Sequence, residues 1–421
     1  MKKKLLNFIM TVWARLTFRG TPSPECWVFS SVHNRAFNYN SRYLFCYVKE
    51  HCPGIHPYYV TEDPAVYREL AGRYGEEFLI DTSTLAGIRK VLSCQVWFTS
   101  TAPPLYGVGF RKKYRIYNLW HGIPLKTIGM EQKNLSPATR AYYRYFFADN
   151  YTGVLTTSSR LAPLMSRSFL VEPERVRVWG QPRCDCLFEK VDAQKVLREI
   201  FRDEIPEENR EMHWGADAVP KEAAAVPNFD KAVLYAPTFR DHGETRLFPF
   251  PEFDGSGNGR ERLEAFLKEH RMFLCIRMHL YDQTAYGWLA EMDHPGSRVR
   301  FLNEDRAEDV MEVLGCFDLL ITDYSSIYLD FLLTGRPMMF LPYDRGEYLA
   351  DRGLNFDYDQ VTPGPKPESF AEFLRWLGGL TEGEDPWAEE RARVRRFFHE
   401  VEGPCCGKIC RMVEKEIAEI R

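Results

Sequence analysis

A histidine follows directly after a short apolar run in the segment YNLWHGIPLK. His121 comes at the carboxyl end of a strand predicted over residues 115–120, and Gly122 behind it lets the main chain turn sharply or approach a ligand. An imidazole titrates near neutral pH, so His121 is suited to accept a proton from a hydroxyl group. The alternative is a structural histidine packed beside Trp120. The position at a strand end alone favours the catalytic and the structural interpretation about equally.

The segment DLLITDYSSIYLDFLL places four polar residues where a predicted strand meets a predicted helix. Thr322 and Asp323 end the strand, and Ser325 and Ser326 open the helix. Free N–H groups at a helix start bind anions together with nearby hydroxyls, so this junction predicts a phosphate or diphosphate site. Plain N-capping by either serine is the alternative, and it is compatible with phosphate binding. The sequence GxxxxGK[ST] of a P-loop does not occur.

Two further strand ends carry cationic side chains. In YAPTFRD, Pro237 and Thr238 shape a turn before Arg240, whose guanidinium is suited to bidentate phosphate binding. In IRMHL, Arg277 and His279 are two residues apart, which places both on the same face of a strand. Two arginines and a histidine that meet hydroxyls and a helix start would suit a diphosphate leaving group.

These side chains must be positioned by a regular alternation of strands and helices. Twelve short apolar runs are predicted as strands, at residues 26–30, 56–61, 77–80, 95–99, 115–120, 153–157, 175–179, 232–237, 272–280, 298–302, 318–324 and 337–343. Helical segments separate most of them, which predicts the α/β class with mostly parallel sheets. We expect a pair of doubly wound, Rossmann-like domains that face a central cleft, with the site at the strand carboxyl ends.

Breaks in this alternation predict the domain boundaries. Residues 195–228 contain the Ala- and Pro-rich run GADAVPKEAAAVPNFD and no strand pattern. The predicted order is a basic amphipathic segment over 1–20, an N-terminal Rossmann-like domain over 21–194, a linker or insertion over 195–228, a C-terminal Rossmann-like domain over 229–385 and C-terminal helices over 386–421.

The first twenty residues contain five basic residues and no acidic one. At helical spacing the apolar face holds Leu5, Phe8, Ile9, Val12 and Leu16, and the opposite face holds Lys4, Asn7, Thr11 and Arg15. The apolar stretch is too short to span a bilayer. A helix on an anionic membrane surface is the favoured interpretation, with a helix packed on the protein itself or a signal peptide as alternatives.

Composition narrows the class of protein. The chain has 421 residues and a net charge of -4, which gives no reason to expect a nucleic-acid partner. The eleven cysteines are scattered, which favours reduced thiols in a cytosol. Two clusters exist, Cys184 with Cys186 and Cys405 with Cys406 and Cys410, but neither supplies the four ligands of a zinc site, so no metal site is predicted.

At these motifs the sequence resembles the CDP-glycerol glycerophosphotransferase family, which builds teichoic-acid-type polymers and some capsules. The similar stretches run from about residue 27 to 380 and are NYNSRYLFCYV, LWHGIPLKTIG, GQPRCDCLF, YAPTFRD, IRMHL, ITDYSSIYLDFLLTGRPMMFLPYD and RGLNFDYDQVTPGP. The resemblance implies a GT-B-like fold in which the domain over 21–194 lies on the acceptor side and the domain over 229–385 binds the CDP-polyol. Three positions depart from the family pattern: Leu280 replaces a usual proline, Ile123 a usual threonine and Leu119 a polar residue.

The resemblance also implies roles for individual residues. His121 matches the proposed catalytic base and His279 a second essential histidine near the transferred phosphate. Phosphate contacts are implied for Arg240, Ser325 and Ser326, and acidic motif positions for Asp323 and Asp330.

The expected function follows from the motifs and the resemblance together. We expect transfer of glycerol phosphate from CDP-glycerol to a hydroxyl of a teichoic-acid-like or capsular polymer, or of its lipid-linked primer, with release of CMP. No cofactor is expected, and nothing in the motifs demands a divalent metal. The expected location is cytoplasmic and peripheral, on the inner face of the bacterial cell membrane. The alternatives are a CDP-ribitol ribitolphosphotransferase, a GT-B nucleotide-sugar glycosyltransferase and a non-catalytic nucleotide-binding scaffold at the membrane.

Overall fold

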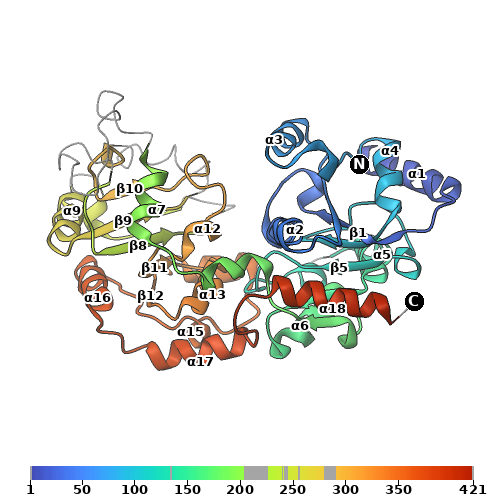
Figure 1. Cartoon of the computed structure of the whole chain (residues 1–421). Coiled ribbons are helices and arrows are strands. Elements are labelled where there is room, and N and C mark those ends of the chain that lie inside the picture. Colours follow the sequence, from blue (N-terminus) through green and yellow to red (C-terminus); the bar gives the residue numbers. More distant parts are fainter. Residues whose placement is uncertain are drawn as a thin grey trace, which may run out of the picture. The chain divides into compact units, whose positions relative to one another are not determined.

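The computed structural model describes residues 2–132, 135–202, 226–238, 240, 245–254, 257–278 and 291–419. The chain forms two compact units (Figure 1). Unit 1 consists of residues 1–185 and 397–421, and unit 2 of residues 186–396. The division thus falls before residue 186, earlier than the expected boundary at 194/195, and the last 25 residues belong to unit 1. Most of the predicted insertion, residues 203–225, lies outside the described residues.

Unit 1 is built on a parallel sheet of seven strands in the order β3-β2-β1-β4-β5-β6-β7. The strands are β1 (Ser23–Ser30), β2 (His56–Val60), β3 (Leu79–Ile80), β4 (Cys94–Thr99), β5 (Arg115–Asn118), β6 (Gly153–Thr156) and β7 (Val176–Val178). The helices are α1 (Lys2–Thr17), α2 (Tyr39–His51), α3 (Pro64–Tyr74), α4 (Leu85–Leu92), α5 (Pro137–Phe146), α6 (Ala162–Phe169) and α18 (Cys406–Ala418). In the central strand β1, Trp27, Val28 and Phe29 are all buried, as expected for a parallel strand covered on both faces.

Unit 2 has a parallel sheet of five strands in the order β10-β9-β8-β11-β12. The strands are β8 (Lys231–Ala236), β9 (Met272–Ile276), β10 (Val299–Phe301), β11 (Leu319–Thr322) and β12 (Met338–Phe340). The helices are α7 (Ala193–Ile200), α9 (Gly259–Glu269), α12 (Met311–Leu314), α13 (Ile327–Phe331), α14 (Arg345–Arg352), α15 (Tyr358–Val361), α16 (Phe370–Glu382) and α17 (Ala388–Phe398). All twelve strands coincide with predicted ones, which confirms the α/β class and the two doubly wound sheets.

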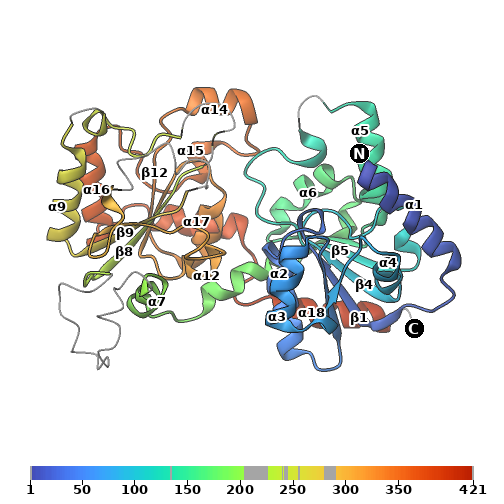
Figure 2. The same cartoon turned by 90° about the horizontal axis from the view of Figure 1, so that it is seen from above.

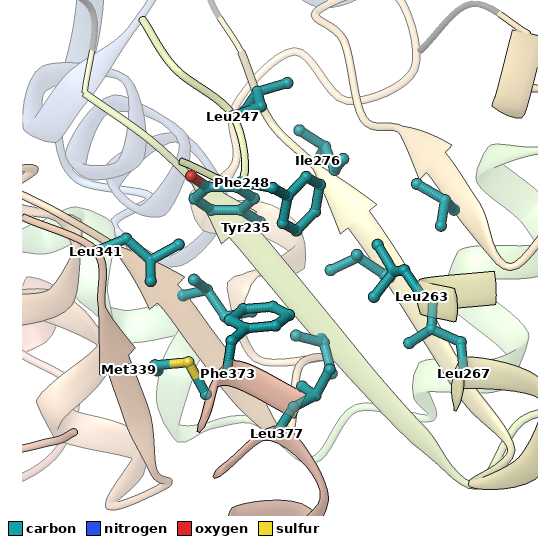
Figure 3. Packing of buried hydrophobic residues seen from close by; sticks show 14 of the residues in the cluster. Tyr235, Leu247, Phe248, Leu263, Leu267, Ile276, Met339, Leu341, Phe373 and Leu377 are labelled. Atoms are coloured by element: carbon teal, nitrogen blue, oxygen red, sulfur yellow. The ribbon is translucent and has the colours of Figure 1, made fainter. Parts of the chain in front are cut away.

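The core of unit 2 lies between one face of its sheet and the helices α9 and α16 (Figure 3). Tyr235 and Ile276 point from the strands toward this layer, where Leu263 of α9 and Phe373 of α16 also lie. Burial of these side chains stabilises the packing of α9 and α16 on the sheet. The polar loops lie at the strand ends.

The C-terminal helix α18 returns to unit 1 (Figures 1 and 2). The carboxylate of Asp185 accepts hydrogen bonds from the amides of Cys405 (2.7 Å) and Cys406 (2.9 Å) at the start of α18. Near its end, Glu416 accepts a hydrogen bond of 2.6 Å from the Tyr117 hydroxyl and pairs with Arg177. The predicted C-terminal helices therefore divide between the units, because α17 packs on unit 2 through Arg391, which donates to the Gly335 carbonyl.

The N-terminal helix α1 packs on unit 1 beside α4 through its polar side (Figure 2). Asn7 and Thr11 are buried, and Asn7 donates to the Thr82 carbonyl at 3.3 Å. The opposite side carries an exposed set of side chains that we call the α1 apolar face: Leu5, Leu6, Ile9, Val12, Trp13 and Leu16. Of the residues predicted on the polar face, Asn7 and Thr11 are buried and Arg15 is exposed, and Phe8 of the predicted apolar face is half-buried. None of the helices in the described parts of the chain has the length and apolar character needed to cross a membrane.

Candidate active-site residues

Most of the predicted functional residues lie at the points where the two sheets reverse their strand order. In unit 1 this point lies between β1 and β4, and in unit 2 between β8 and β11. Loops at the carboxyl ends of such strands diverge and leave room for a ligand, which makes this the usual binding position of doubly wound sheets. His121 follows β5, the neighbour of β4, and Asp323 follows β11.

The imidazole of His121 is held in one tautomer. Its Nδ1 lies 3.0 Å from the main-chain carbonyl of Ser100, the residue after β4. A carbonyl only accepts hydrogen bonds, so Nδ1 carries the proton and donates it. The neutral ring therefore keeps a lone pair on Nε2, which is the ring atom that can accept a proton.

The surroundings of His121 favour its neutral form. Burial, together with the charge of the nearby Arg183, lowers the pKa of His121 to about 4. The ring contacts Trp120 (centroids 3.9 Å apart) and Tyr39 (5.0 Å apart, interplanar angle 29°). His121 is therefore neutral at physiological pH and is ready to act as a base without first losing a proton.

Both aromatic neighbours of His121 have strained main chains. Tyr39 has φ of 57° and Trp120 has φ of 53°, in the left-handed region that bulky residues rarely adopt. Each such residue costs about 1–3 kcal/mol and persists only where surrounding contacts enforce it. For Trp120, one such contact is the hydrogen bond of 2.8 Å from its amide to Asn118 Oδ1. Strain of this kind gathers at functional sites, which supports a role for His121 beyond packing.

In unit 2, Asp323 ties together the ends of β8 and β11. Its Oδ1 accepts hydrogen bonds from the amides of Thr238 (2.8 Å) and Tyr324 (2.6 Å), and its Oδ2 accepts one from Arg240 Nη2 (2.8 Å). Thr322 adds a further link, because its hydroxyl donates to the Ala236 carbonyl at 2.7 Å. Thr322 and Asp323 are both buried, and their hydrogen bonds connect the ends of β8 and β11.

Arg240 lies in the same cluster, with its guanidinium engaged by protein groups. Besides Asp323 it donates to Asp344 (Nε to Oδ2, 2.6 Å) and to the Thr238 carbonyl (2.6 Å), and its side chain is 5% exposed. Burial alone would lower the pKa of Arg240, but the carboxylates of Asp344 and Asp323 raise it above its usual value. In this arrangement Arg240 positions the loops around it, and direct contact with a phosphate would require it to exchange a partner.

Ser325 and Ser326 are half-buried, whereas Tyr324 before them is buried. The helix that they were predicted to open, α13, spans only Ile327–Phe331. Its capping is weak, since the Ile327 amide reaches Ser325 Oγ at 3.5 Å and Ser326 makes no capping hydrogen bond. The serine hydroxyls thus remain accessible at the end of β11, although such a short helix adds little dipole.

The remaining predicted residues have other surroundings. Arg277 donates to the carbonyls of Leu302 (2.9 Å) and Ala307 (2.7 Å), which holds the segment after β10, and burial lowers the pKa of Arg277. Asp330 is 1% exposed inside α13. Pro237 continues from β8 into the loop that holds Thr238. His279 lies outside the described residues, as does Leu280.

Three residues near these sites were not singled out from the sequence. Tyr39 and Arg183 lie close to His121, and Asp344 binds Arg240. All three fall within stretches of family resemblance, which was the only signal for them. Among the described residues, no group of three or more His, Cys, Asp or Glu side chains is placed to hold a metal ion.

Several known proteins with similar sequences are teichoic acid transferases or polymerases. The chain is 24% identical over 423 residues to the teichoic acid glycerol-phosphate transferase of Staphylococcus aureus (strain NCTC 8325 / PS 47), covering 98% of both chains. It is 26% identical over 270 residues to the teichoic acid ribitol-phosphate polymerase TarK of the same strain, covering 64% of this chain and 46% of TarK. To the teichoic acid poly(glycerol phosphate) polymerase of Bacillus subtilis (strain 168) it is 24% identical over 362 residues, covering 82% of this chain and 43% of that one. The chain thus spans less than half the length of these two polymerases.

The fold also has solved counterparts. A structure of the wall teichoic acid polymerase TagF superposes with a TM-score of 0.74 at 20% identity, covering 97% of this chain and 93% of that one. The UDP-GlcNAc 2-epimerase from Methanocaldococcus jannaschii shares the fold more distantly, with a TM-score of 0.53, 9% identity and coverage of 93% and 99%. These likenesses confirm the predicted GT-B-like architecture. A family model matches residues 14–415, and the chain belongs to the CDP-glycerol:poly(glycerophosphate) glycerophosphotransferase family.

Proposed function

We propose that this protein transfers glycerol phosphate from CDP-glycerol to a hydroxyl group of a teichoic-acid-like or capsular polymer, or of its lipid-linked primer. The observation that carries the proposal is the state of His121, a neutral imidazole with Nδ1 bound to the Ser100 carbonyl and Nε2 able to accept a proton. Family membership and the similarity to a glycerol-phosphate transferase over 98% of both chains support the choice of donor. A variant of TagF has also been solved after a soak with CDPG.

The reaction proceeds by one displacement at phosphorus. The acceptor oxygen attacks the phosphorus that bears glycerol, the anhydride bond to the other phosphorus breaks, and CMP leaves with the bridging oxygen. His121 Nε2 takes the acceptor's proton as the new bond forms. Such transfers depend on positioning and on neutralising the phosphate oxygens more than on covalent help from the protein.

Unit 2 supplies the groups assigned to the diphosphate. The accessible hydroxyls of Ser325 and Ser326 bind it, and Asp323 and Arg240 hold the strand ends that present them. His279 is assigned to the transferred phosphate from the family resemblance, and Arg277 and Asp330 support the surrounding segments.

Release of CMP tests this assignment. Purified protein is offered CDP-glycerol, CDP-ribitol and a UDP-sugar, each with lipid-linked and polymeric acceptors. CMP release and glycerol phosphate transfer with CDP-glycerol alone are the expected result. A ribitol donor is the second candidate, because relatives such as TarK are ribitol-phosphate polymerases. Sugar transfer would show a glycosyltransferase, and donor binding without turnover under every acceptor would show a scaffold.

We infer further that the α1 apolar face rests on an anionic membrane at the cytoplasmic side of the bacterial cell. Leu5, Ile9 and Leu16 of this face are 55–72% exposed, which would be costly in water without a covering surface. Cationic side chains flank it: Arg89 lies 5.0 Å from the Trp13 ring and Arg15 lies 4.6 Å from the Phe110 ring. Apolar insertion with basic flanks is how interfacial helices bind anionic lipids, and it would bring the enzyme to a lipid-linked acceptor.

A further inference from the structure

Three consecutive residues at the start of α2 each contact a different part of the surroundings of His121. Tyr39 places its ring 5.0 Å from the imidazole. Asn40 binds the two carbonyls that precede the histidine, and Ser41 binds Ser100, whose carbonyl accepts the Nδ1 proton. The ring, the main chain and the tautomer of His121 are thus all set from one turn of one helix.

Asn40 makes the most specific of these contacts. Its side-chain amide is fully buried, and Nδ2 donates to the carbonyls of Leu119 (3.1 Å) and Trp120 (2.9 Å). Its Oδ1 accepts a hydrogen bond of 3.0 Å from the Arg183 amide. Only a primary amide offers two donors and an acceptor at this reach, because a carboxylate cannot donate and a hydroxyl has a single proton.

The hydrogen bonds of Asn40 act where the main chain is strained. Trp120 carries the left-handed φ of 53°, and its carbonyl leads directly into His121. Without the amide, the two carbonyls would be buried without these partners, and the strained turn would lose contacts that enforce it. The same side chain fixes the main chain of Arg183, whose charge acts on the imidazole.

Ser41 completes the arrangement from the other side. Its amide donates to Ser100 Oγ at 2.9 Å, and the two hydroxyls lie 2.8 Å apart. Ser100 is held in addition by its own amide, which donates to the Ser30 carbonyl at 3.1 Å. The residue whose carbonyl selects the Nδ1–H tautomer is therefore fixed by Ser41 at the start of α2 and by Ser30 at the end of β1.

We propose that Asn40 is the positioning residue of His121: it holds the main chain on which the imidazole stands so that Nε2 faces the acceptor hydroxyl. This assignment rests on the proposed function only for its kinetic consequence, because the geometry of the imidazole can be measured without any substrate. The charged group that acts on the protonation of His121 is Arg183, from the segment after β7, and the ring of Tyr39, from α2, lies against the imidazole.

The chain offers a matched control in Asn150. This asparagine is also fully buried in unit 1, donates to the carbonyls of Gly107 (2.7 Å) and Phe146 (3.0 Å), and accepts from the Phe110 amide (2.9 Å). Asn40→Leu and Asn150→Leu therefore each remove three hydrogen bonds of the same kinds, two donated and one accepted, from a buried site. We expect a similar drop in melting temperature for both.

The two variants should differ in catalysis. Misplacing a catalytic group by about 1 Å costs roughly 100-fold in rate, so Asn40→Leu should lower kcat for glycerol phosphate transfer by about that factor. Its KM for CDP-glycerol should stay within about twofold of wild type, because the donor groups belong to unit 2. Asn150→Leu should keep kcat within about threefold. Equal kcat values for the two variants would overturn the proposal. If Asn40→Leu fails to fold, Asn40→Ser takes its place.

An NMR measurement tests the positioning role of Asn40 without any turnover of substrate. Nitrogen-15 NMR of histidine-labelled protein, with the His121 signals identified by their loss in His121→Gln, should show the Nδ1–H tautomer in wild type and in Asn150→Leu. In Asn40→Leu we expect mixed tautomers and a titration midpoint moved upward toward the ordinary value of about 6.5. An unchanged His121 spectrum in Asn40→Leu would refute the positioning role even in an active enzyme. A changed spectrum in a protein that turns over no CDP-alcohol would support that role while the proposed function fails.

Discussion

Asp344 binds the guanidinium of Arg240 through both carboxylate oxygens. Oδ2 accepts from Nε at 2.6 Å and Oδ1 from Nη2 at 3.0 Å, with Asp323 on the same Nη2. Arg240 is buried and Asp344 is half-buried, and the rings of Tyr324, Tyr343 and Tyr348 lie 5.1–5.2 Å from the guanidinium carbon. Through this contact Arg240, from the loop after β8, holds the loop after β12. Through Asp323 it also holds the loop after β11.

Asp344→Asn should destabilise the protein by about 2 kcal/mol. The change keeps the side-chain shape but removes the charge and one acceptor from the pair, which leaves the buried Arg240 less well compensated. The free energy of unfolding in urea measures the effect. Asp359→Asn is the control, because Asp359 pairs with Arg345 at the surface and exposed pairs contribute less than about 1 kcal/mol. Equal losses for the two variants would show that Asp344 does not support Arg240.

His121→Ala should lower kcat by about 100-fold to 10,000-fold, which is the usual range for loss of a general base. Binding of CDP-glycerol, measured by calorimetry, should change little, since the donor groups are assigned to unit 2. The control is His294→Ala, whose ring is exposed and contacts the Pro295 carbonyl of its own loop. Wild-type turnover by His121→Ala would remove the base from the mechanism.

The pH dependence of stability should report the protonation of the His121 imidazole. In the folded protein the pKa of His121 is about 4, whereas in the unfolded chain it is about 6.5. Between these values the unfolded state binds more protons, so stability falls as pH drops from about 6.5 to 4 and is fully retained above about 6.5. His121→Gln should flatten this slope, with a difference on the order of 3 kcal/mol at pH 4. Parallel stability curves for wild type and variant would contradict the lowered pKa.

The same pKa governs catalysis. Only the neutral imidazole accepts a proton, so the acid limb of kcat/KM assigned to His121 should lie near pH 4. A limb near pH 6.5 that disappears in His121→Ala would instead indicate a solvated ring.

Asp185→Ala should loosen α18 selectively. The Asp185 carboxylate binds the two amides at the start of this helix, and loss of such a cap costs about 1–2 kcal/mol. Hydrogen exchange should quicken in residues 405–418 and little elsewhere. Asp63→Ala is the matched variant, because Asp63 caps α3 through the amides of Ala65 and Val66, and its effect should be confined to α3. Unchanged exchange in α18 would mean that its apolar side alone holds it.

Membrane binding should depend on the α1 apolar face. Ile9→Asp and Leu16→Asp should lower co-sedimentation with vesicles that contain phosphatidylglycerol by about tenfold or more, because each puts a charge where a side chain would enter the lipid. Ala65→Asp adds the same charge to an exposed position of α3 and should have little effect. If all three variants bind alike, the face does not rest on lipid.

Local sequence patterns determined the elements of this protein and the loops that carry its chemistry. Apolar runs such as those around Val28 and Leu320 make strands wherever they are buried, and the polar residue that ends such a run, as His121 and Asp323 do, lies at a sheet edge by the same local rule. The helical period likewise revealed the two faces of α1.

Only the tertiary structure decided which groups meet. Arg240 and Asp344 are 104 residues apart, Asn40 and Arg183 are 143 apart, and Asp185 meets Cys405 across 220. Such pairings depend on strand order and loop path, which residue types do not specify. They give the buried Arg240 two carboxylate partners, and its contact with a phosphate stays a prediction. The same holds for α1, whose packed side holds Asn7, which bonds to Thr82 and Tyr106, and Ala14, which is buried in the core of unit 1.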